Sequence, residues 1–395
     1  MKIVFIGPFG LRPKMTMQSR ALPLAKALVR RGHQVSLLIP PWDDPERAGQ
    51  SWVEAGVRVV NLPLPAPIPG LFQLRLAWNL VAGALALRPE VIHFFKPKAY
   101  AGLAHLMLWW LRRVKGWPVR LVLDTDDWEQ AWNERLAYPA WQKKLFAWQE
   151  VWGLRHADAV TVASRALEAL AAAYRPAGLF YVPNGYLTDP ANGANKKEEA
   201  ASQRVRQQWD LGEAPVVLLY TRFVEYRLER LVTLVRQVAE RAPEARWLIV
   251  GQGLHGEEEK LAAQLAGAGL ASRVRLTGWA SPEQLSALFQ TANVAIFPAD
   301  DTLINRTKCS VKLIDLLLAG LPVVADAVGQ NCEYIQSGVS GLLVPAGDDL
   351  AFSQAVAELL QAPDRQQSVG AAARRRLLAT FNWDRLTQIV ERAYH

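Results

Sequence analysis

The sequence ADDTLINRTKCSVKLIDLLLAGLPVVAD, residues 299–326, decides the fold. It follows an apolar run, Val294–Phe297, which predicts a buried strand. The polar residues 300–308 predict a loop, and Ser310–Ala319 has apolar side chains at helical spacing. Leu321–Ala325 predicts a second buried strand. A strand, a loop, a helix and a strand within about 30 residues have the size of one parallel crossover.

Three charged residues in this segment are candidates for ligand binding. Lys308, Lys312 and Asp315 are spaced i, i+4 and i+7, which predicts a shared helix face. Loops at the carboxyl ends of parallel strands are where such sheets bind ligands. The two lysines would suit a phosphate, and the carboxylate would suit sugar hydroxyls. The alternative is an ordinary solvated helix face, and the rest of the chain has to decide between them.

Strands alternating with helices along the whole chain predict two α/β domains with doubly wound parallel sheets. The predicted domains are residues 1–187 and 209–370, joined by a polar linker at 188–208. Residues 371–395 are predicted to be helical and to cross back to the N-terminal domain.

Charge and tryptophan are concentrated in the first half of the chain. Residues 1–187 contain 23 Lys and Arg against 13 Asp and Glu, and 11 of the 15 tryptophans. The remainder contains 22 Lys and Arg against 24 Asp and Glu. This asymmetry suggests an anionic membrane surface or nucleic acid as a neighbour. We expect no nucleic-acid binding, because no recognised binding motif accompanies the charge.

Aromatic and basic residues alternate in two of the predicted helices. Trp109, Trp110, Arg112 and Arg113 form one such cluster. This composition is typical of a helix on an anionic membrane surface, although a core with a solvated rim has the same composition. No apolar stretch is long enough to cross a bilayer, and two cysteines are too few for a disulfide framework. The expected location is therefore cytoplasmic, with peripheral attachment to the inner face of the membrane.

The C-terminal half repeatedly places anion-binding groups after a strand. Arg222 follows the strand at residues 216–220, and Arg227 lies five residues further on. Arginine at such positions can hold a diphosphate with two hydrogen bonds. Gly251 and Gly253 allow close backbone approach, although they lack the third glycine of a dinucleotide fingerprint. Another loop, containing Gly329 and Glu333, offers backbone amides to an anion.

Several motifs follow one another in a recognisable order. They are RRGHQV (30–35), VPNGY (182–186), TRFVEYR (221–227), LIVGQG (248–253), RVRLTGWASPEQLSALFQTANVAIFP (273–298) and AGLPVVADAVGQNCEYIQSGVSGLLVPAGD (319–348). Together they resemble the retaining glycosyltransferases of family 4, which have the GT-B fold. The resemblance covers nearly the whole chain. It implies that two Rossmann-like domains bind a nucleotide-sugar donor, mostly through the C-terminal domain, and that no metal or other cofactor is needed.

The resemblance also implies roles for individual residues. Arg222 matches the arginine on the donor diphosphate, and Arg227 occupies a position usually held by lysine. Asp315 matches the second glutamate of the family's Glu-x7-Glu motif, which binds the ribose. Thr307 stands where the first glutamate is expected, and that glutamate normally contacts the donor sugar. Lys308 and Lys312 would then reorganise the site around phosphate.

The N-terminal domain would bind a saccharide or lipid-linked acceptor. His93 matches a histidine that lies near the donor sugar in relatives, although a histidine at a strand end is commonly structural. Asp126, within the run Asp124-Thr-Asp-Asp-Trp-Glu129, is expected to orient acceptor hydroxyls or to act as a base. The alternative for this run is a metal site, because Asp-x-Asp binds a metal in the other glycosyltransferase fold. That fold has one sheet, whereas this chain predicts two.

Two further functions stay open at this stage. A catalytically impaired protein of this fold could bind a nucleotide-sugar or act as a scaffold, which the loss of the glutamate at Thr307 favours. An epimerase of the same fold would act on the nucleotide-sugar itself.

Overall fold

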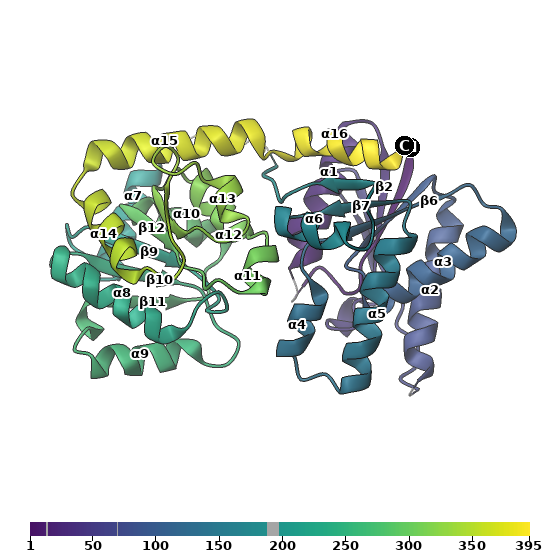
Figure 1. The fold of residues 1–395 in the computed structure, drawn as a ribbon, viewed down its shortest axis with the longest axis horizontal. Helices are drawn as coiled ribbons and strands as arrows, with labels where there is room; N and C mark the ends of the chain where they lie inside the picture. The colour runs from purple at the N-terminus through teal and green to yellow at the C-terminus, as the bar shows by residue number, and fades with distance from the viewer. Residues whose placement is uncertain (13–14, 69, 188–196) are drawn as a thin grey trace. The chain divides into compact units, whose positions relative to one another are not determined.

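The computed structural model describes residues 1–12, 15–68, 70–187 and 197–395. The chain divides into two compact units, each with its own parallel sheet (Figure 1). The first unit comprises Met1–Thr188, Thr307–Cys309 and Phe381–His395, and the second comprises Asp189–Arg306 and Ser310–Thr380. Two α/β domains with parallel sheets are what the sequence predicts.

The first unit is built on an eight-stranded sheet in the order β3-β4-β2-β1-β5-β6-β7-β8. Its pairings are parallel except that β3 runs antiparallel to β4 at the edge. The central strands are buried along nearly their whole length because helices cover both faces of the sheet. The strands are β1 Lys2–Ile6, β2 Gln34–Ile39, β3 Ser51–Glu54, β4 Val57–Asn61, β5 Val91–Phe95, β6 Arg120–Thr125, β7 Ala159–Val162 and β8 Leu179–Tyr181.

The helices of the first unit include one element from the far end of the chain. Helix α16 packs against α1, so the last residues complete this unit's core. The helical segments are η1 Met17–Ala21, α1 Leu22–Arg30, η2 Pro45–Arg47, α2 Leu71–Leu87, α3 Ala99–Lys115, α4 Glu129–Arg135, α5 Ala140–His156, α6 Arg165–Ala172 and α16 Trp383–Tyr394.

The second unit contains a six-stranded parallel sheet in the order β11-β10-β9-β12-β13-β14. Its strands are β9 Val216–Tyr220, β10 Arg246–Val250, β11 Val274–Gly278, β12 Val294–Phe297, β13 Val323–Asp326 and β14 Leu342–Val344. Its helical segments are α7 Lys197–Gln208, α8 Leu228–Arg241, α9 Glu257–Gly267, η3 Ala271–Arg273, α10 Pro282–Thr291, α11 Leu303–Thr307, α12 Val311–Leu318, α13 Asn331–Tyr334, α14 Asp349–Leu360 and α15 Pro363–Thr380.

The prediction of a linker at residues 188–208 is wrong for the second half of that segment. Residues 197–208 form helix α7, which packs against α10, and residues 188–196 lie outside the described part of the chain. The Ser202 hydroxyl lies 3.2 Å from that of Thr291. The sequence KEEAASQRVRQQ is polar, but nearly every residue in it is a good helix former.

Two other boundaries differ from the sequence analysis. Residues 300–308 were expected to form a loop, but Leu303–Thr307 is the short helix α11. The helical region at 371–395 is interrupted, because α15 ends at Thr380 and α16 begins at Trp383. The Asn382 side chain caps α16 by accepting a hydrogen bond from the Arg385 amide at 2.8 Å.

Candidate active site

The parallel strands of the second unit bring several loops to one edge of its sheet. Gly251 ends β10 with a φ of 129°, which an L-residue rarely adopts. A Cβ atom there would lie 1.8 Å from the Thr221 carbonyl oxygen at the end of β9. Gly329 follows β13 with a φ of 50°, and a Cβ atom there would lie 2.4 Å from the Arg306 oxygen. Both glycines therefore let loops approach each other where a side chain would not fit.

Two arginines from the loop after β9 are exposed at this edge. Arg222 is exposed, and Arg227 is 82% exposed with its Nε atom 3.9 Å from an Asp300 oxygen. Such side chains can rotate toward a ligand without breaking a buried contact. The position of both fits the predicted role in binding a diphosphate.

Arg230, one helical turn after Arg227, has a different role that the sequence analysis did not identify. Its buried guanidinium donates to both carboxylate oxygens of Asp326, at 2.8 and 2.9 Å, and to Asp349 at 2.6 Å. Asp326 also accepts a hydrogen bond from the Ala299 amide at 2.7 Å. Arg230 therefore links the ends of β12 and β13 through Asp326.

Asp315 lies on α12 at the same edge. Burial raises the pKa of Asp315 to about 7, and the nearby Lys312 ammonium opposes part of the rise. Burial and the Asp315 charge raise the pKa of Tyr220 to about 12, while Arg222 opposes that shift. Asp315, Tyr220 and Arg222 are therefore close enough to interact electrostatically. Lys312 Nζ lies 3.4 Å from the buried carboxylate of Glu225.

The predicted helix face of Lys308, Lys312 and Asp315 is wrong in part. Helix α12 begins at Val311, so Lys308 precedes the helix and does not share its face. Thr307 is fully buried, and its carbonyl oxygen accepts a hydrogen bond from the Ser164 hydroxyl at 2.8 Å within the first unit. Lys308 lies outside the helix because α11 ends at Thr307 and the chain turns before α12 begins.

Gly253 and Glu333, the other two residues predicted to contact the donor, are half-buried, and their backbone groups already form hydrogen bonds. The Gly253 amide donates to a Glu258 carboxylate oxygen at 2.9 Å, which leaves Gly251 as the closer approach point. Glu333 lies on α13, where its carbonyl oxygen accepts from the Arg376 guanidinium at 2.8 Å.

The structure places His93 in the core of the first unit, which does not fit the predicted catalytic role. His93 is fully buried in β5, with Nδ1 2.9 Å from the Tyr394 hydroxyl and Nε2 3.2 Å from the Thr161 hydroxyl. Its ring stacks on Phe95. Burial, reinforced by the Arg20 charge, lowers the pKa of His93 to about 3, so the ring is neutral. We assign His93 to the core of the first unit.

A buried ion pair beside His93 was also missed. Arg20 donates to both oxygens of Asp124, at 2.7 and 2.6 Å, and to Asn184 at 2.9 Å. Asp124 accepts a further hydrogen bond from Thr161 at 2.6 Å. The first aspartate of the Asp-x-Asp run therefore points into the core and is not available for a metal.

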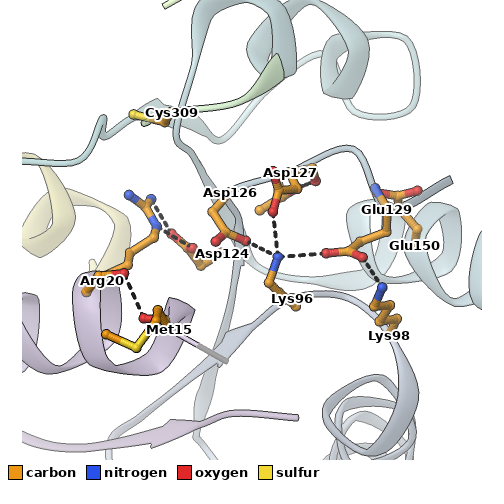
Figure 2. Close-up of polar contacts among 12 residues, drawn as sticks. Met15, Arg20, Lys96, Lys98, Asp124, Asp126, Asp127, Glu129, Glu150 and Cys309 are labelled. Carbon is orange, nitrogen blue, oxygen red and sulfur yellow. Dashed lines mark hydrogen bonds and ion pairs between the residues drawn. The ribbon is translucent and has the colours of Figure 1, made fainter. Parts of the chain in front are cut away.

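Asp126 lies in a second charged cluster at the carboxyl ends of β5 and β6 (Figure 2). The Lys96 ammonium lies 2.9 Å from Asp126, 2.8 Å from Asp127 and 2.9 Å from Glu129. Lys98 forms a further ion pair with Glu129. Asp126 and Asp127 are partly exposed, so both can contact a ligand at this edge.

The predicted membrane-binding cluster is only partly on the surface. Trp109 packs edge-on against Trp152 of α5, with ring centroids 5.5 Å apart. Arg112 is ion-paired with Asp158 and donates to the Val119 carbonyl. These two residues were expected to face a membrane, but they hold α3 against its neighbours. Trp110, in contrast, is 58% exposed.

The exposed aromatic and basic residues of α3 and α5 form a surface that we call the aromatic–basic face. On α5 its members recur on one side of the helix. The face comprises Trp110, Arg113, Trp141, Lys144, Trp148 and Arg155. The Arg113 guanidinium stacks on Trp109 at 4.1 Å, and Trp148 lies 6.2 Å from Trp152, so these two members of the face lie beside the Trp109–Trp152 contact between α3 and α5. None of the helices among the described residues is long and apolar enough to cross a membrane.

Comparison with known proteins agrees with this arrangement. Residues 16–185 match the family model described as "Glycosyl transferase 4-like domain", and residues 214–362 match "Glycosyl transferases group 1". A Mycobacterium tuberculosis protein described as a GDP-mannose-dependent alpha-(1-6)-phosphatidylinositol monomannoside mannosyltransferase is 28% identical over 369 residues. That match covers 90% of this chain and 88% of the relative.

Solved structures show the same fold. Sucrose-phosphate synthase from Thermosynechococcus elongatus superposes with a TM-score of 0.74 at 22% identity, covering 100% of this chain and 98% of the other. Anabaena HepE in complex with UDP-glucose gives 0.72 at 18% identity, with 99% of each chain covered. The two α/β units and these neighbours show that the protein has the GT-B fold. The two family-model matches define it as a glycosyltransferase. The chain belongs to the glycosyl transferases group 1 family.

Proposed function

We propose that this protein transfers a sugar, with retention of anomeric configuration, from a nucleotide-diphosphate-sugar to a saccharide or lipid-linked acceptor. The observation that carries the proposal is the edge of the second unit, where the loop after β9 exposes Arg222 and Arg227 and helix α12 carries Lys312 and Asp315. Three cations suit a diphosphate, and a carboxylate suits the two ribose hydroxyls. The name of the mycobacterial relative supports a lipid-linked acceptor.

In the proposed reaction the bond between the sugar C1 and the diphosphate oxygen breaks. The acceptor hydroxyl oxygen forms a new bond to C1 on the same face, and its proton passes to the departing phosphate. Arg222 and Arg227 stabilise the negative charge that develops on this leaving group. Asp126 orients the acceptor hydroxyl. We propose that no metal takes part, because side-chain cations are present for the charge that a metal would otherwise neutralise.

The test begins with release of nucleoside diphosphate from a panel that includes UDP-glucose and GDP-mannose. Acceptors are free saccharides and vesicles that contain a mannosylated inositol lipid. Both donors carry α-linked sugars, so NMR of the product should show an α linkage. Neither hydrolysis nor transfer with any donor would refute the enzyme proposal, and isomerised donor without acceptor would indicate an epimerase.

Site variants test the assignment of residues. Arg222→Ala should lower kcat by about 10²- to 10³-fold, as expected for loss of a group that stabilises the leaving-group charge. Asp315→Ala should mainly weaken donor binding, by about tenfold or more. Arg236→Ala is the matched control, because Arg236 is exposed on α8 away from the strand ends. Unchanged kinetics in both site variants would overturn the assignment.

We further propose that the aromatic–basic face binds anionic membrane surfaces. Tryptophan rings favour the interface, and each basic residue near an anionic surface contributes about 1 kcal/mol. Trp110→Ala combined with Trp148→Ala should reduce sedimentation with anionic vesicles, and added salt should reduce the binding of the unmodified protein. Trp279→Ala, another exposed tryptophan, is the control. If the double variant and the Trp279→Ala control bind anionic vesicles equally well, this role is refuted.

A further inference from the structure

The Lys96 side chain ends among three carboxylates (Figure 2). Its ammonium lies 2.9, 2.8 and 2.9 Å from Asp126, Asp127 and Glu129. The ammonium donates hydrogen bonds to Asp127 and Glu129, and its contact with Asp126 is an ion pair. Lys96 itself is buried.

The carboxylates are arranged as they would be around a metal ion. Asp126, Asp127 and Glu129 each offer one oxygen, and these oxygens all lie within 4.8 Å of one another. A hard divalent cation takes carboxylate oxygens converging on one point in this way. In this cluster the point of convergence is occupied by Lys96 Nζ.

The backbone around Lys96 is held in an unusual conformation. Lys96 has a φ of 60°, in the left-handed region that disfavours a residue with a Cβ atom. The chain keeps it there through hydrogen bonds from the Lys96 amide to the Asp124 carbonyl, at 3.1 Å, and from the Lys98 amide to the Lys96 carbonyl, at 2.9 Å. A strained backbone at a lysine indicates that its side-chain direction matters at this position.

The charges of the cluster agree with this arrangement. Burial would raise the pKa of Glu129, but Lys96 and Lys98 lower it to about 2, so Glu129 is ionised. Burial and the neighbouring Asp126 and Glu129 charges raise the pKa of Asp127 despite Lys96. The pKa of Lys96 is held well above its usual value by Asp126, Asp127 and Glu129, although burial acts in the opposite direction. Removing this one ammonium would leave three carboxylates facing one another.

We propose that Lys96 is the resident cation of this cluster, occupying the position of a divalent metal and holding Asp126 and Asp127 in place at the sheet edge. The chain itself therefore supplies the cation that its carboxylates require. Without the ammonium, the cluster becomes a divalent-cation site.

The test variant is Lys96→Gly, because glycine adopts a φ of 60° without strain. Terbium(III) is the probe, and its emission is excited through Trp128, which lies between Asp127 and Glu129 in the chain. The variant should give saturable emission that calcium displaces, with an affinity at least about tenfold above that of the unmodified protein. Lys98→Met is the matched control, because Lys98 contacts Glu129 only within the cluster and leaves Lys96 in place.

Thermal unfolding gives a second measurement. Calcium at about one hundred times its Kd should raise the Tm of Lys96→Gly by about 5 °C and leave the unmodified protein unchanged. Adding Asp127→Asn to Lys96→Gly should abolish the shift. If Lys96→Gly does not fold, Lys96→Asn replaces it, because asparagine also tolerates positive φ.

Two results would overturn the proposal. One is saturable terbium binding by the unmodified protein as tight as that of Lys96→Gly. The other is a folded variant, native by circular dichroism, that binds neither terbium nor calcium. These measurements need no sugar donor, so their outcome is independent of the proposed glycosyl transfer.

Discussion

Asp315 carries a carboxyl group that changes its protonation state near neutral pH. Burial raises its pKa to about 7, against an unfolded value of about 3.9. In the proposed site the ionised carboxylate accepts hydrogen bonds from the ribose hydroxyls. At a pKa of about 7 only about a tenth of the group is ionised at pH 6, and about nine-tenths at pH 8.

The affinity for a nucleoside diphosphate should therefore rise about tenfold between pH 6 and pH 8. Asp315→Asn should bind more weakly than the unmodified protein at pH 8 and lose this dependence on pH. Titration calorimetry at four pH values measures both. A slope that persists in Asp315→Asn would assign the titration to another group.

Stability should change in the opposite direction. Because the folded pKa of Asp315 lies above the unfolded value, the folded state holds the proton more tightly. The free energy of unfolding therefore falls as the pH rises from about 4 to 7, by about 3 kcal/mol. Asp315→Asn should be the more stable protein at pH 8, measured by urea unfolding. Equal stability of the two proteins at pH 8 would contradict the raised pKa.

His93 and His105 are both neutral and buried in the first unit. Burial is the main cause that lowers the pKa of each to about 3; Arg20 adds to it for His93, and His156 and Arg112 add to it for His105 against Asp158. His105 stacks on Phe94, and its Nε2 atom has no hydrogen-bond partner among the residues that the structure describes. The unfolded chain binds a proton at each histidine near pH 6.5, whereas the folded chain does not.

The stability that depends on these two histidines is present above about pH 6.5 and lost as the pH falls toward 3. Each should cost about 1.4 kcal/mol per pH unit over that range. His105→Phe keeps the ring stacked on Phe94 and removes the proton, so it should be less sensitive to acid. Urea unfolding at pH 7 and pH 5.5 measures this, with the exposed His255→Phe as the control. If the free energy of unfolding of His105→Phe falls between pH 7 and pH 5.5 as much as that of the unmodified protein, the expectation is contradicted.

At the scale of elements, α16 completes the core of the first unit. Trp383 and Val390 are fully buried in the core of that unit, and Tyr394 bonds to His93. On the outer side, Glu391 accepts from Arg31 at 2.7 Å and lies 2.9 Å from His33. The helix thus joins the core through both apolar and polar contacts.

Trp383→Ala should reduce the free energy of unfolding by about 3 to 5 kcal/mol, because it opens a large cavity. Tyr394→Phe removes only one hydrogen bond and should cost about 1 kcal/mol. Denaturant unfolding followed by circular dichroism measures both. Trp279→Ala should be nearly neutral, since Trp279 is exposed. A loss for Trp383→Ala no larger than that of the control would contradict the central role of α16.

The elements were largely predictable because buried parallel strands are continuous apolar runs. Val216–Tyr220 and Val294–Phe297 were predicted with the bounds that the structure shows. Strand β3 was missed because it is a short edge strand with little apolar character. The break before α16 had a local signal, since Asn382 is a good N-cap.

The site was less predictable because its contacts join distant parts of the chain. Arg20 and Asp124 are 104 residues apart, and Lys96 and Asp127 are 31 apart. Sequence patterns show that such residues follow strands, but packing decides which charge meets which. The same limit explains His93, since a strand position does not reveal whether the side chain faces the core or a ligand. Arg222 and Asp315 were predicted because each matches a family motif, and their roles stay predictions.

At the scale of the whole molecule, the two units differ in how the chain builds them. The second unit uses residues 189–380 almost without interruption, whereas the first needs residues 381–395 as well. A fragment containing residues 189–380 should therefore fold alone and bind a nucleoside diphosphate. A fragment containing residues 1–188 should be unstable, because it lacks Trp383, Val390 and Tyr394.

Adding residues 381–395 to the 1–188 fragment through a Gly-Ser linker should restore a cooperative unfolding transition. Circular dichroism and calorimetry of the three fragments measure this. The same linker followed by a sequence in which Trp383 and Val390 are replaced by Ser is the matched control. Cooperative folding of the 1–188 fragment alone would show that α16 is dispensable.

The return of the chain at residue 381 also governs the order of events during synthesis. Proteins of several domains usually fold from the N-terminus as the chain leaves the ribosome. Here the eight strands of the first unit are translated early, but the helix that seals their core emerges after the second unit is finished. The nascent first unit therefore keeps apolar surface open while some 190 residues are added. A chaperone that protects such surface should crosslink to the stalled chain until residue 395 has been released.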